Sequence, residues 1–212
     1  MVSVPRVWAQ GKNDMDVSRE TREKLDIYQK LLLKWQTKIN LVSSKTMGEF
    51  WIRHVADSLQ LLDYADNGLI WADIGSGGGF PGMVLAIALS NNSQSLVHLI
   101  ETDARKCVFL NEVARATGAQ VVVHNLPAAK VLQSLNDVEV ITSRAVTAVA
   151  KLVQWSEVQL ERGAVGLFLK GQHVEDELTS LPISSKFFWN VLPGLAGTSS
   201  YVVQVRHQLA NR

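Results

Sequence analysis

The chain has a single cysteine, Cys107, among its 212 residues, which excludes an internal disulfide and a cysteine-based metal cluster. A lone cysteine also fits a reducing compartment. No apolar run reaches the length that a membrane-crossing helix needs, and the residues after Met1 lack the pattern of a secretory signal. We therefore expect a soluble, cytoplasmic protein with no membrane partner.

An excess of charge of either sign is also lacking, because 21 basic and 20 acidic residues leave a formal net charge of +1. This balance neither indicates nor excludes a polyanionic partner, so nucleic-acid binding would require a local basic patch. Internal repeats and low-complexity segments are absent. No metal is expected, because four of the five histidines lack the spacing of metal ligands: His98, His124, His173 and His207.

The apolar residues within the segment 1–66 have the spacing of helices. After Ser18, which can cap a helix, apolar residues recur every three or four positions, and we expect this helix to end at Asn40. The same pattern predicts a second helix from about Met47 to Tyr64. We assign residues 1–66 to a helical extension that packs on a core domain of residues 67–212, with roughly the first dozen residues outside the fold.

The rest of the chain alternates short apolar runs with helical patterns, which predicts an α/β fold with a doubly wound, mostly parallel sheet of seven strands. The last two runs lie close together and predict a hairpin at the edge. The predicted strands are Leu69–Ile74, Ser95–Glu101, Gln120–His124, Val138–Thr142, Ala164–Leu169, Lys186–Val191 and Tyr201–Arg206. The predicted helices between them are Met83–Leu89, Asp103–Thr117, Pro127–Leu135 and Val146–Glu161.

A glycine-rich turn follows the first predicted strand and is the most informative stretch of the chain. Its glycines, Gly75 and Gly77 among them, let the backbone approach a ligand closely, and Pro81 suits the first turn of the helix that follows. Asp73 at the strand end would repel a pyrophosphate but can hold the ammonium of a methionine moiety. The turn therefore favours a nucleotide-type cofactor cradle. Gly77, Gly79 and Gly82 also fit the dinucleotide pattern G-x-G-x-x-G, which is weak by itself.

A second acid, Glu101, closes the next predicted strand about twenty residues further on, where a carboxylate can accept from both ribose hydroxyls. Thr102 and Asp103 follow it at the rim of the predicted site. The alternative role for an acid here is to cap the helix that begins near Ala104, and Asp103 suits that role well. We interpret Glu101 as the ribose ligand and leave both roles open for Asp103.

Basic residues gather around the same edge of the predicted sheet. Arg144 ends the fourth strand, where it would bind cofactor or hold the acids of the cradle; the alternative is an ion pair with Asp73 or another buried carboxylate that only fixes the loop. Arg53 and His54 share a helix face with Asp57, and either touch RNA or belong to a solvated face with an Arg53–Asp57 pair. Three more residues are candidates for phosphate contacts, namely Arg105, Lys106 and Lys170. The alternative for each is a side chain that is merely solvated.

Together these segments resemble the RsmG (GidB) family. The resemblance covers residues 25–172 and rests on several motifs in a fixed order: Asn40-Leu41, Arg53-His54-Val-Ala-Asp57-Ser58, Asp73 to Gly82, Arg105-Lys106, Ser143-Arg144-Ala145 and Leu169-Lys170-Gly171. The resemblance implies a class I (Rossmann-like) methyltransferase that uses S-adenosyl-L-methionine (AdoMet) to methylate N7 of a guanine in the 530 loop of 16S rRNA. It also implies that Phe80 belongs to the cofactor site, and we expect a monomer.

One segment departs from the family's pattern. After the third strand the family usually has a basic residue followed two places later by an acid, whereas this chain has Asn125-Leu126-Pro127-Ala128. The adenine-side loop is still expected at Pro127 and Ala128, whose backbone groups can serve the base. The sequence leaves open whether a side chain or the backbone alone recognises adenine at this place.

The reaction that the resemblance implies agrees with what the sequence lacks. Methylation at a pyrimidine C5 needs a thiolate after the fourth strand, but Cys107 lies on the helix after the second. An exocyclic amine usually needs an Asp/Asn-Pro-Pro-aromatic turn, and Ser143-Arg144-Ala145 occupies that place. Guanine N7 carries a lone pair and loses no proton, so the enzyme needs positioning rather than a catalytic base, with Arg144 the one candidate for a direct role.

Two other functions remain open from the residues alone. An NAD-dependent oxidoreductase is permitted by the glycine pattern, but it predicts an apolar residue in place of Asp73 and a catalytic Tyr-x-x-x-Lys or His, and neither is found. A non-catalytic RNA-binding or ribosome-assembly module on a methyltransferase scaffold would be supported if the cradle failed to bind AdoMet. The glycines and Glu101 argue against that second function without excluding it.

Overall fold

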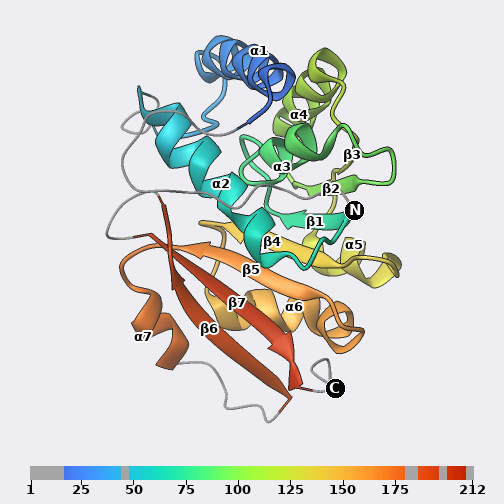
Figure 1. Ribbon diagram of the computed structural model, residues 1–212, viewed down its shortest axis with the longest axis vertical. Helices are drawn as coiled ribbons and strands as arrows, with labels where there is room; N and C mark the ends of the chain where they lie inside the picture. The colour runs from blue at the N-terminus through green and yellow to red at the C-terminus, as the bar shows by residue number, and fades with distance from the viewer. Residues whose placement is uncertain (1–16, 44–47, 180–185, 196–199, 209–212) are drawn as a thin grey trace.

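The computed structural model describes residues 17–43, 48–179, 186–195 and 200–208 and has one seven-stranded sheet with helices on both faces (Figure 1). The strand order is β3-β2-β1-β4-β5-β7-β6, with β1 at Ile70–Ile74, β2 at Leu96–Ile100, β3 at Val121–His124, β4 at Val140–Arg144, β5 at Val165–Lys170, β6 at Phe187–Pro193 and β7 at Tyr201–His207. The expected first dozen unfolded residues and part of the expected turn between β6 and β7 lie outside the described residues.

The first five strands are parallel, and β7 runs antiparallel between β5 and β6. The predicted parallel sheet with a terminal hairpin is therefore confirmed. Because the order reverses between β1 and β4, the carboxyl ends of these strands border the crevice where doubly wound folds bind ligands. Asp73 of β1 lies in this region, in register with Leu99 of β2 and Thr142 of β4.

The helical elements are α1 (Arg19–Gln36), the π-helix η2 (Phe50–Ala56), the short α2 (Asp57–Leu59), the 3-10 helix η3 (Gln60–Tyr64), α3 (Gly82–Leu89), α4 (Ala104–Thr117), α5 (Ala128–Ser134), α6 (Val149–Glu161) and α7 (Val174–Thr179). Two predictions need correction. The helix expected over Met47–Tyr64 is a run of three helical forms, and α7 was not predicted. No helix within the described part of the chain is long and apolar enough to cross a membrane.

The first helix ends at Gln36, four residues before the predicted end at Asn40. The Gln36 side chain explains the early stop, because its Oε1 accepts hydrogen bonds from the backbone N–H groups of Leu41 and Val42 at 2.9 and 3.0 Å. The chain therefore leaves the helix and turns toward the sheet edge. The start of the helix is as predicted, since the Ser18 side chain accepts from the Thr21 N–H.

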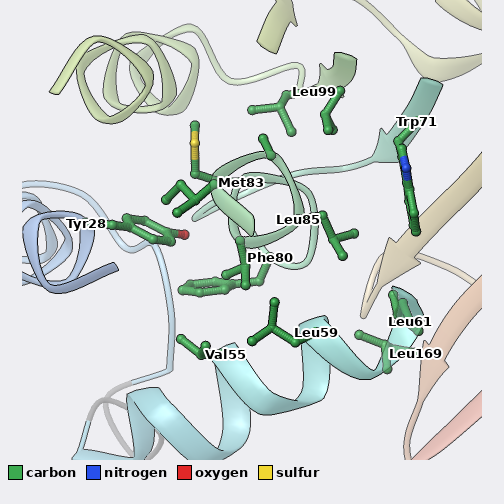
Figure 2. Close-up of a cluster of buried hydrophobic side chains, with 14 of the residues drawn as sticks. Tyr28, Val55, Leu59, Leu61, Trp71, Phe80, Met83, Leu85, Leu99 and Leu169 are labelled. Carbon is green, nitrogen blue, oxygen red and sulfur yellow. The ribbon is translucent and has the colours of Figure 1, made fainter. Parts of the chain in front are cut away.

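Two apolar cores lie on opposite faces of the sheet, because successive residues of a strand point to opposite faces. Trp71 of β1 belongs to the core shared with α1, α3, α4 and the η2–α2 segment, whereas its neighbour Ala72 belongs to the core under α5 and α6. Figure 2 shows the first core, in which Tyr28 of α1 and Val55 and Leu59 of the η2–α2 segment converge on α3. The N-terminal helices thus pack directly on the glycine loop and its helix, while a domain boundary at residue 66 stays a prediction.

Candidate active site

The glycine loop between β1 and α3 brings the backbone to the edge of a cavity. Gly77 has φ +55°, and a Cβ atom built there would meet only the Gly75 carbonyl oxygen, at 3.7 Å, so its open side is available to a ligand. At Gly82, by contrast, a Cβ atom would lie 2.6 Å from Asp73 Oδ2. The first glycine exposes backbone to the cavity, and the second lets α3 approach β1.

Asp73 lies beneath this loop and does not line the cavity. Its side chain is fully buried, its Oδ2 accepts from the Gly82 N–H at 3.2 Å, and its Oδ1 accepts from the Thr142 hydroxyl at 3.0 Å. Burial raises the pKa of this carboxyl to about 6, although the hydrogen bonds oppose the shift. This carboxyl anchors the start of α3 to β1 and β4, and the contact with a ligand ammonium, directly or through water, stays a prediction.

Glu101 joins the glycine loop to the end of β2. Its Oε2 accepts from the Gly77 N–H at 2.9 Å, and its Oε1 accepts from the N–H groups of Thr102 and Asp103 at 2.7 and 2.9 Å. Asp103 has the helix-capping role, since it is the N-cap of α4 and accepts from the Arg105 N–H. Hydrogen bonds from Arg105 also lower the pKa of Asp103. Backbone groups therefore hold the Glu101 carboxylate at the cavity wall.

A cavity of about 1050 Å³ lies along the carboxyl ends of the central strands. It brings together ten of the predicted site residues, namely Gly75, Gly77, Phe80, Glu101, Thr102, Arg144, Arg53, His54, Lys106 and Lys170. Four other candidates do not line it, namely Asp103, Arg105, Pro127 and Ala128; Arg105 is exposed and pairs with Asp103, and Pro127 is the N-cap of α5. Asn125, at the departure from the family pattern, donates its side-chain amide to the carbonyl oxygens of Glu101 and Thr102.

An aromatic and cationic stack forms the wall above the glycine loop. The His54 ring is buried and stacks on Phe80 with centroids 4.5 Å apart, and the Arg144 guanidinium lies 4.8 Å from the centre of the Phe80 ring. Arg144 also donates to the Arg53 carbonyl oxygen at 3.1 Å. No salt bridge joins Arg144 to Asp73 among the described residues.

The helix face that carries Arg53 and His54 differs from the solvated face considered as an alternative. Arg53 forms its ion pair with Glu49, not with Asp57, which corrects the pair expected from sequence spacing. His54 and Asp57 are both only 5% exposed. Burial lowers the pKa of Arg144, while the nearby Asp57 is the strongest of the charges that oppose this shift. This helix segment is therefore part of the cavity wall and not a free surface.

Lys170 is held inside the wall instead of extending into solvent. Its side chain is 7% exposed, and its ammonium pairs with Glu177 at 2.7 Å and donates to the Thr147 carbonyl oxygen at 2.5 Å. The alternative of a merely solvated lysine is therefore wrong, while the phosphate contact stays a prediction. Lys170 links β5, α7 and the segment after β4.

The lining residues that were not predicted as site residues include Asp57, Glu177 and Ser200. They come from α2, from α7 and from the start of the segment that leads into β7, so no local spacing connects them. Asp57 accepts from the Gln60 side chain at 2.7 Å and from the Ser200 hydroxyl at 3.0 Å. Two signals in the sequence concerned Asp57: its place four residues after Arg53, which was interpreted as an ion-pair spacing, and its place in the Arg53-to-Ser58 motif of the family resemblance.

Cys107 has no place in this chemistry. It is buried on α4, its thiol donates toward the Glu101 carbonyl oxygen at 3.5 Å, and burial raises its pKa. A thiol of this kind is a poor nucleophile. The site thus offers a backbone cradle with an acid at one end and an aromatic, cationic and acidic wall at the other.

The comparisons with known proteins agree with this arrangement. Residues 21–189 match the family model GidB, described as rRNA small subunit methyltransferase G. A protein named Ribosomal RNA small subunit methyltransferase G from Bradyrhizobium sp. (strain BTAi1) is 47% identical over 180 residues, 84% of this chain and 79% of that protein. One of the same name from Methylorubrum populi is 43% identical over 190 residues, with 90% of each chain covered.

Solved structures of lower identity share the fold. Cofactor-bound Rv0187 from MTB superposes with a TM-score of 0.58 at 16% identity, over 86% of this chain and 88% of that one. A mutant of MtNAS in complex with S-adenosylmethionine gives a TM-score of 0.55 at 16% identity, over 88% of this chain and 76% of that one. At these identities the likeness concerns the fold, and it agrees with the predicted class I methyltransferase architecture.

Proposed function

The chain belongs to the GidB family of rRNA small subunit methyltransferases, and we propose that it transfers the methyl group of AdoMet to N7 of a guanine in 16S rRNA. The observation that carries the proposal is that one cavity joins the glycine loop and Glu101 to Arg53, His54 and Arg144. A cofactor site and a nucleic-acid site are thus two ends of one space, as methyl transfer requires.

The cofactor end fits AdoMet by its shape and by its donors and acceptors. The open side of Gly77 leaves room for a ligand against the backbone, and the Glu101 carboxylate is fixed at the wall, where it can accept from ribose hydroxyls. Gly75, Phe80 and Thr102 complete this end of the cavity. AdoMet supplies an electrophilic methyl group on a sulfonium, and the residues named here would hold it.

The remaining predicted cofactor contacts flank the cavity. Pro127 and Ala128 lie at the start of α5, shortly after Asn125, whose amide binds the end of β2, and we propose that their backbone groups serve the adenine ring. Asp103 would act through its cap of α4 rather than by contact. Arg144 would orient ligands beside Phe80, without taking or giving a proton.

The substrate end suits an RNA base and its phosphates. Arg53 is half exposed at the rim, and Lys106 lines the same cavity from α4, so both are candidates for phosphate contacts. His54 packs on Phe80 inside the wall, where a flipped base could stack beside it. Because the N7 lone pair attacks without losing a proton, these residues need only bind, orient and exclude water.

Methyl transfer from labelled AdoMet to small-subunit RNA from cells that lack the enzyme tests this proposal. Naked RNA and assembled subunits would be supplied in parallel, and the labelled base would be mapped. Label at N7 of one guanine of 16S rRNA is the expected result. Label on another base, or NADH binding together with no transfer to any RNA, would overturn the proposal.

The pH dependence of the chemical step gives a second readout. Because no enzyme group must titrate, single-turnover rates with saturating AdoMet and RNA should stay nearly flat from mildly acidic to mildly basic pH. His54→Gln should weaken RNA binding and leave the profile flat. An acidic limb that disappears in this variant would make His54 a general base and would contradict N7 as the target.

We further propose that the enzyme acts in the cytoplasm as a monomer, where small ribosomal subunits supply its RNA substrate. The family's rRNA substrate supports the location. Light scattering of the purified protein at the concentrations used for the transfer assay tests the monomer directly.

A further inference from the structure

The cavity has an acidic residue at its substrate end that the proposed chemistry does not use. Asp57 lines the cavity and is 5% exposed. Its neighbours Val55 and Leu59 point into the core beside α3 (Figure 2), so Asp57, between them in sequence, is turned from that core toward the cavity. A buried carboxylate in a ligand cavity needs an explanation, because burying a charge is unfavourable unless hydrogen bonds compensate.

The position of Asp57 relative to the strands places it away from the cofactor end. Ser200, which donates to Asp57 Oδ1, directly precedes Tyr201, and Tyr201 pairs with Lys170 at the end of β5. The glycine loop and Glu101 belong to β1 and β2, on the other side of β4 in the sheet order. A base bound over β4 and β5 would therefore lie between the methyl donor and Asp57.

Contacts from two elements hold this carboxylate in one orientation. Gln60, itself 3% exposed, donates to Asp57 Oδ1 at 2.7 Å and to the Asp57 carbonyl oxygen at 2.9 Å, and Ser200 donates to the same Oδ1 at 3.0 Å. A carboxylate accepts from up to about four donors, so these contacts are compatible with further N–H groups from a ligand. Asp57 is thus a preorganised hydrogen-bond acceptor facing the cavity.

Guanine has the complementary pattern of donors. N7 lies on one edge of the purine, and the opposite, Watson–Crick edge presents N1–H and the N2 amino group, both donors. A flipped base is commonly recognised through that edge. Adenine presents an acceptor at the corresponding ring nitrogen, which a carboxylate would repel.

We propose that Asp57 is a specificity-determining residue that accepts hydrogen bonds from N1–H and the N2 amino group of the target guanine while N7 faces the methyl donor. The inference rests on the proposed function, because it assumes that a guanine enters the cavity. It assigns the choice of guanine over adenine to one carboxylate, oriented by Gln60 and Ser200.

The other acid at this end, Glu177, is a weaker candidate for this role. Its Oε2 is paired with the Lys170 ammonium at 2.7 Å and accepts from the Val149 N–H at 3.1 Å. Asp57 also lies near a cation, the Arg144 guanidinium, but it is 5% exposed whereas the Glu177 side chain is 30% exposed, and a hydrogen bond is electrostatically stronger where water is excluded. The geometry therefore favours Asp57.

The test compares guanosine with inosine, which keeps N7 and N1–H and lacks the N2 amino group. Splint-ligated 16S rRNA carrying either nucleoside at the target position, assembled into subunits, would be methylated under single-turnover conditions with labelled AdoMet. For the parent enzyme we expect inosine to react about 10- to 100-fold less efficiently, because a hydrogen bond to a charged acceptor is lost. For Asp57→Asn the ratio of guanosine to inosine methylation should fall to within about threefold of one. The NH2 group of the new amide is a hydrogen-bond donor, and it would face the N1–H and N2 donors of the base.

Two further variants control for folding. Asp63→Asn makes the same change at an exposed position of the adjoining η3 and should keep the parent ratio. Asp57→Ala, with its fold checked by AdoMet calorimetry, should also lose the discrimination. A guanosine-to-inosine ratio that stays at the parent value in both Asp57 variants, or a parent ratio near one, would overturn the inference. Absence of any methylation of guanosine by the parent would instead refute the proposed function.

Discussion

The two ends of the cavity are built in different ways. Over β1 and β2, backbone N–H groups of Gly77, Thr102 and Asp103 all point at Glu101, and the wall consists largely of main chain. Over β4, β5 and β7, the wall consists of side chains such as His54 and Lys170, which come from segments far apart in the sequence. A backbone wall suits a cofactor of constant shape, whereas a side-chain wall can be specific for one RNA site.

This difference also sets how each end can be perturbed. At the cofactor end, added bulk on a glycine blocks the approach of a ligand to the backbone. At the substrate end, removal of the Lys170 ammonium takes away the ion-pair partner of Glu177.

The largest expected effect is at Gly77. Gly77→Val should weaken AdoMet binding by roughly 100-fold or more, because the new side chain fills the space where the ligand meets the backbone. Gly118→Val is the matched control: Gly118 also has positive φ, +68°, with no atom within 4 Å of a built Cβ, and it ends α4 away from the cavity. If calorimetry shows equal AdoMet affinities for the two variants, the cofactor site is not against Gly77.

The second effect concerns Asp73, which anchors the start of α3 beneath the glycine loop. The pKa of Asp73 is raised to about 6 in the folded protein from 3.8, so the folded state binds more protons than the unfolded state between about pH 4 and 6. The parent therefore loses stability from this group as pH rises through that window. Asp73→Asn removes this pH-dependent contribution, so its free energy of unfolding relative to that of the parent should rise by roughly 2 kcal/mol from pH 4 to pH 7.

Urea unfolding at a series of pH values measures this difference. Asp63→Asn, at an exposed position, is the matched control for the change in net charge. A relative stability of Asp73→Asn that stays constant, or that falls, between pH 4 and pH 7 would show that the carboxyl is not buried in a raised-pKa state.

The third effect concerns the side-chain end. Lys170→Met removes the ammonium that neutralises Glu177 and should lower the free energy of unfolding by about 2 kcal/mol, less than for a fully buried pair because Glu177 is 30% exposed. Lys186→Met is the control, since Lys186 pairs with Glu157 and Glu161 but is 54% exposed, and its effect should be within about 0.5 kcal/mol. Equal losses for the two variants in denaturant unfolding would mean that the Lys170 pair is an ordinary surface pair.

The smallest effect is at the contact between α1 and the cofactor end. The Tyr28 hydroxyl donates to the Gly78 carbonyl oxygen, and its ring stacks on Phe80 with centroids 5.3 Å apart. Tyr28→Phe should lower stability by about 1 kcal/mol and weaken AdoMet binding severalfold, because the glycine loop loses one tether. Tyr64→Phe, at a partly exposed position, is the control. An unchanged AdoMet affinity in Tyr28→Phe would show that α1 does not position the loop.

The same contrast explains what could be predicted from the sequence. Asp73, Gly77 and Glu101 lie within one strand–loop–helix–strand unit, so their spacing alone predicted the cofactor end, while the anchoring role of Asp73 beneath the loop became visible only in the structure. Asp57 and Ser200 meet only because β7 inserts beside β5, which local periodicity does not report.

Other misses also have local physical causes. The early end of α1 depends on one side chain, Gln36, that binds the backbone beyond the helix, and such a contact is not visible in a propensity pattern. The π-helical turn at Phe50–Ala56 keeps the apolar spacing of an α-helix closely enough to be taken for one. Lys170 was expected near solvent because its acidic partner lies on α7, a short helix with no clear periodic signal.

The most direct test of the two-ended cavity measures both affinities on one variant from each end. Gly77→Val should lose AdoMet binding and keep its affinity for small-subunit RNA, whereas Arg53→Gln should keep AdoMet affinity and bind RNA roughly fivefold more weakly at low salt. Calorimetry for AdoMet and filter binding for RNA give the four values. If Gly77→Val weakens RNA binding as much as Arg53→Gln does, or Arg53→Gln loses AdoMet binding, the two ends are not separate sites and the account is wrong.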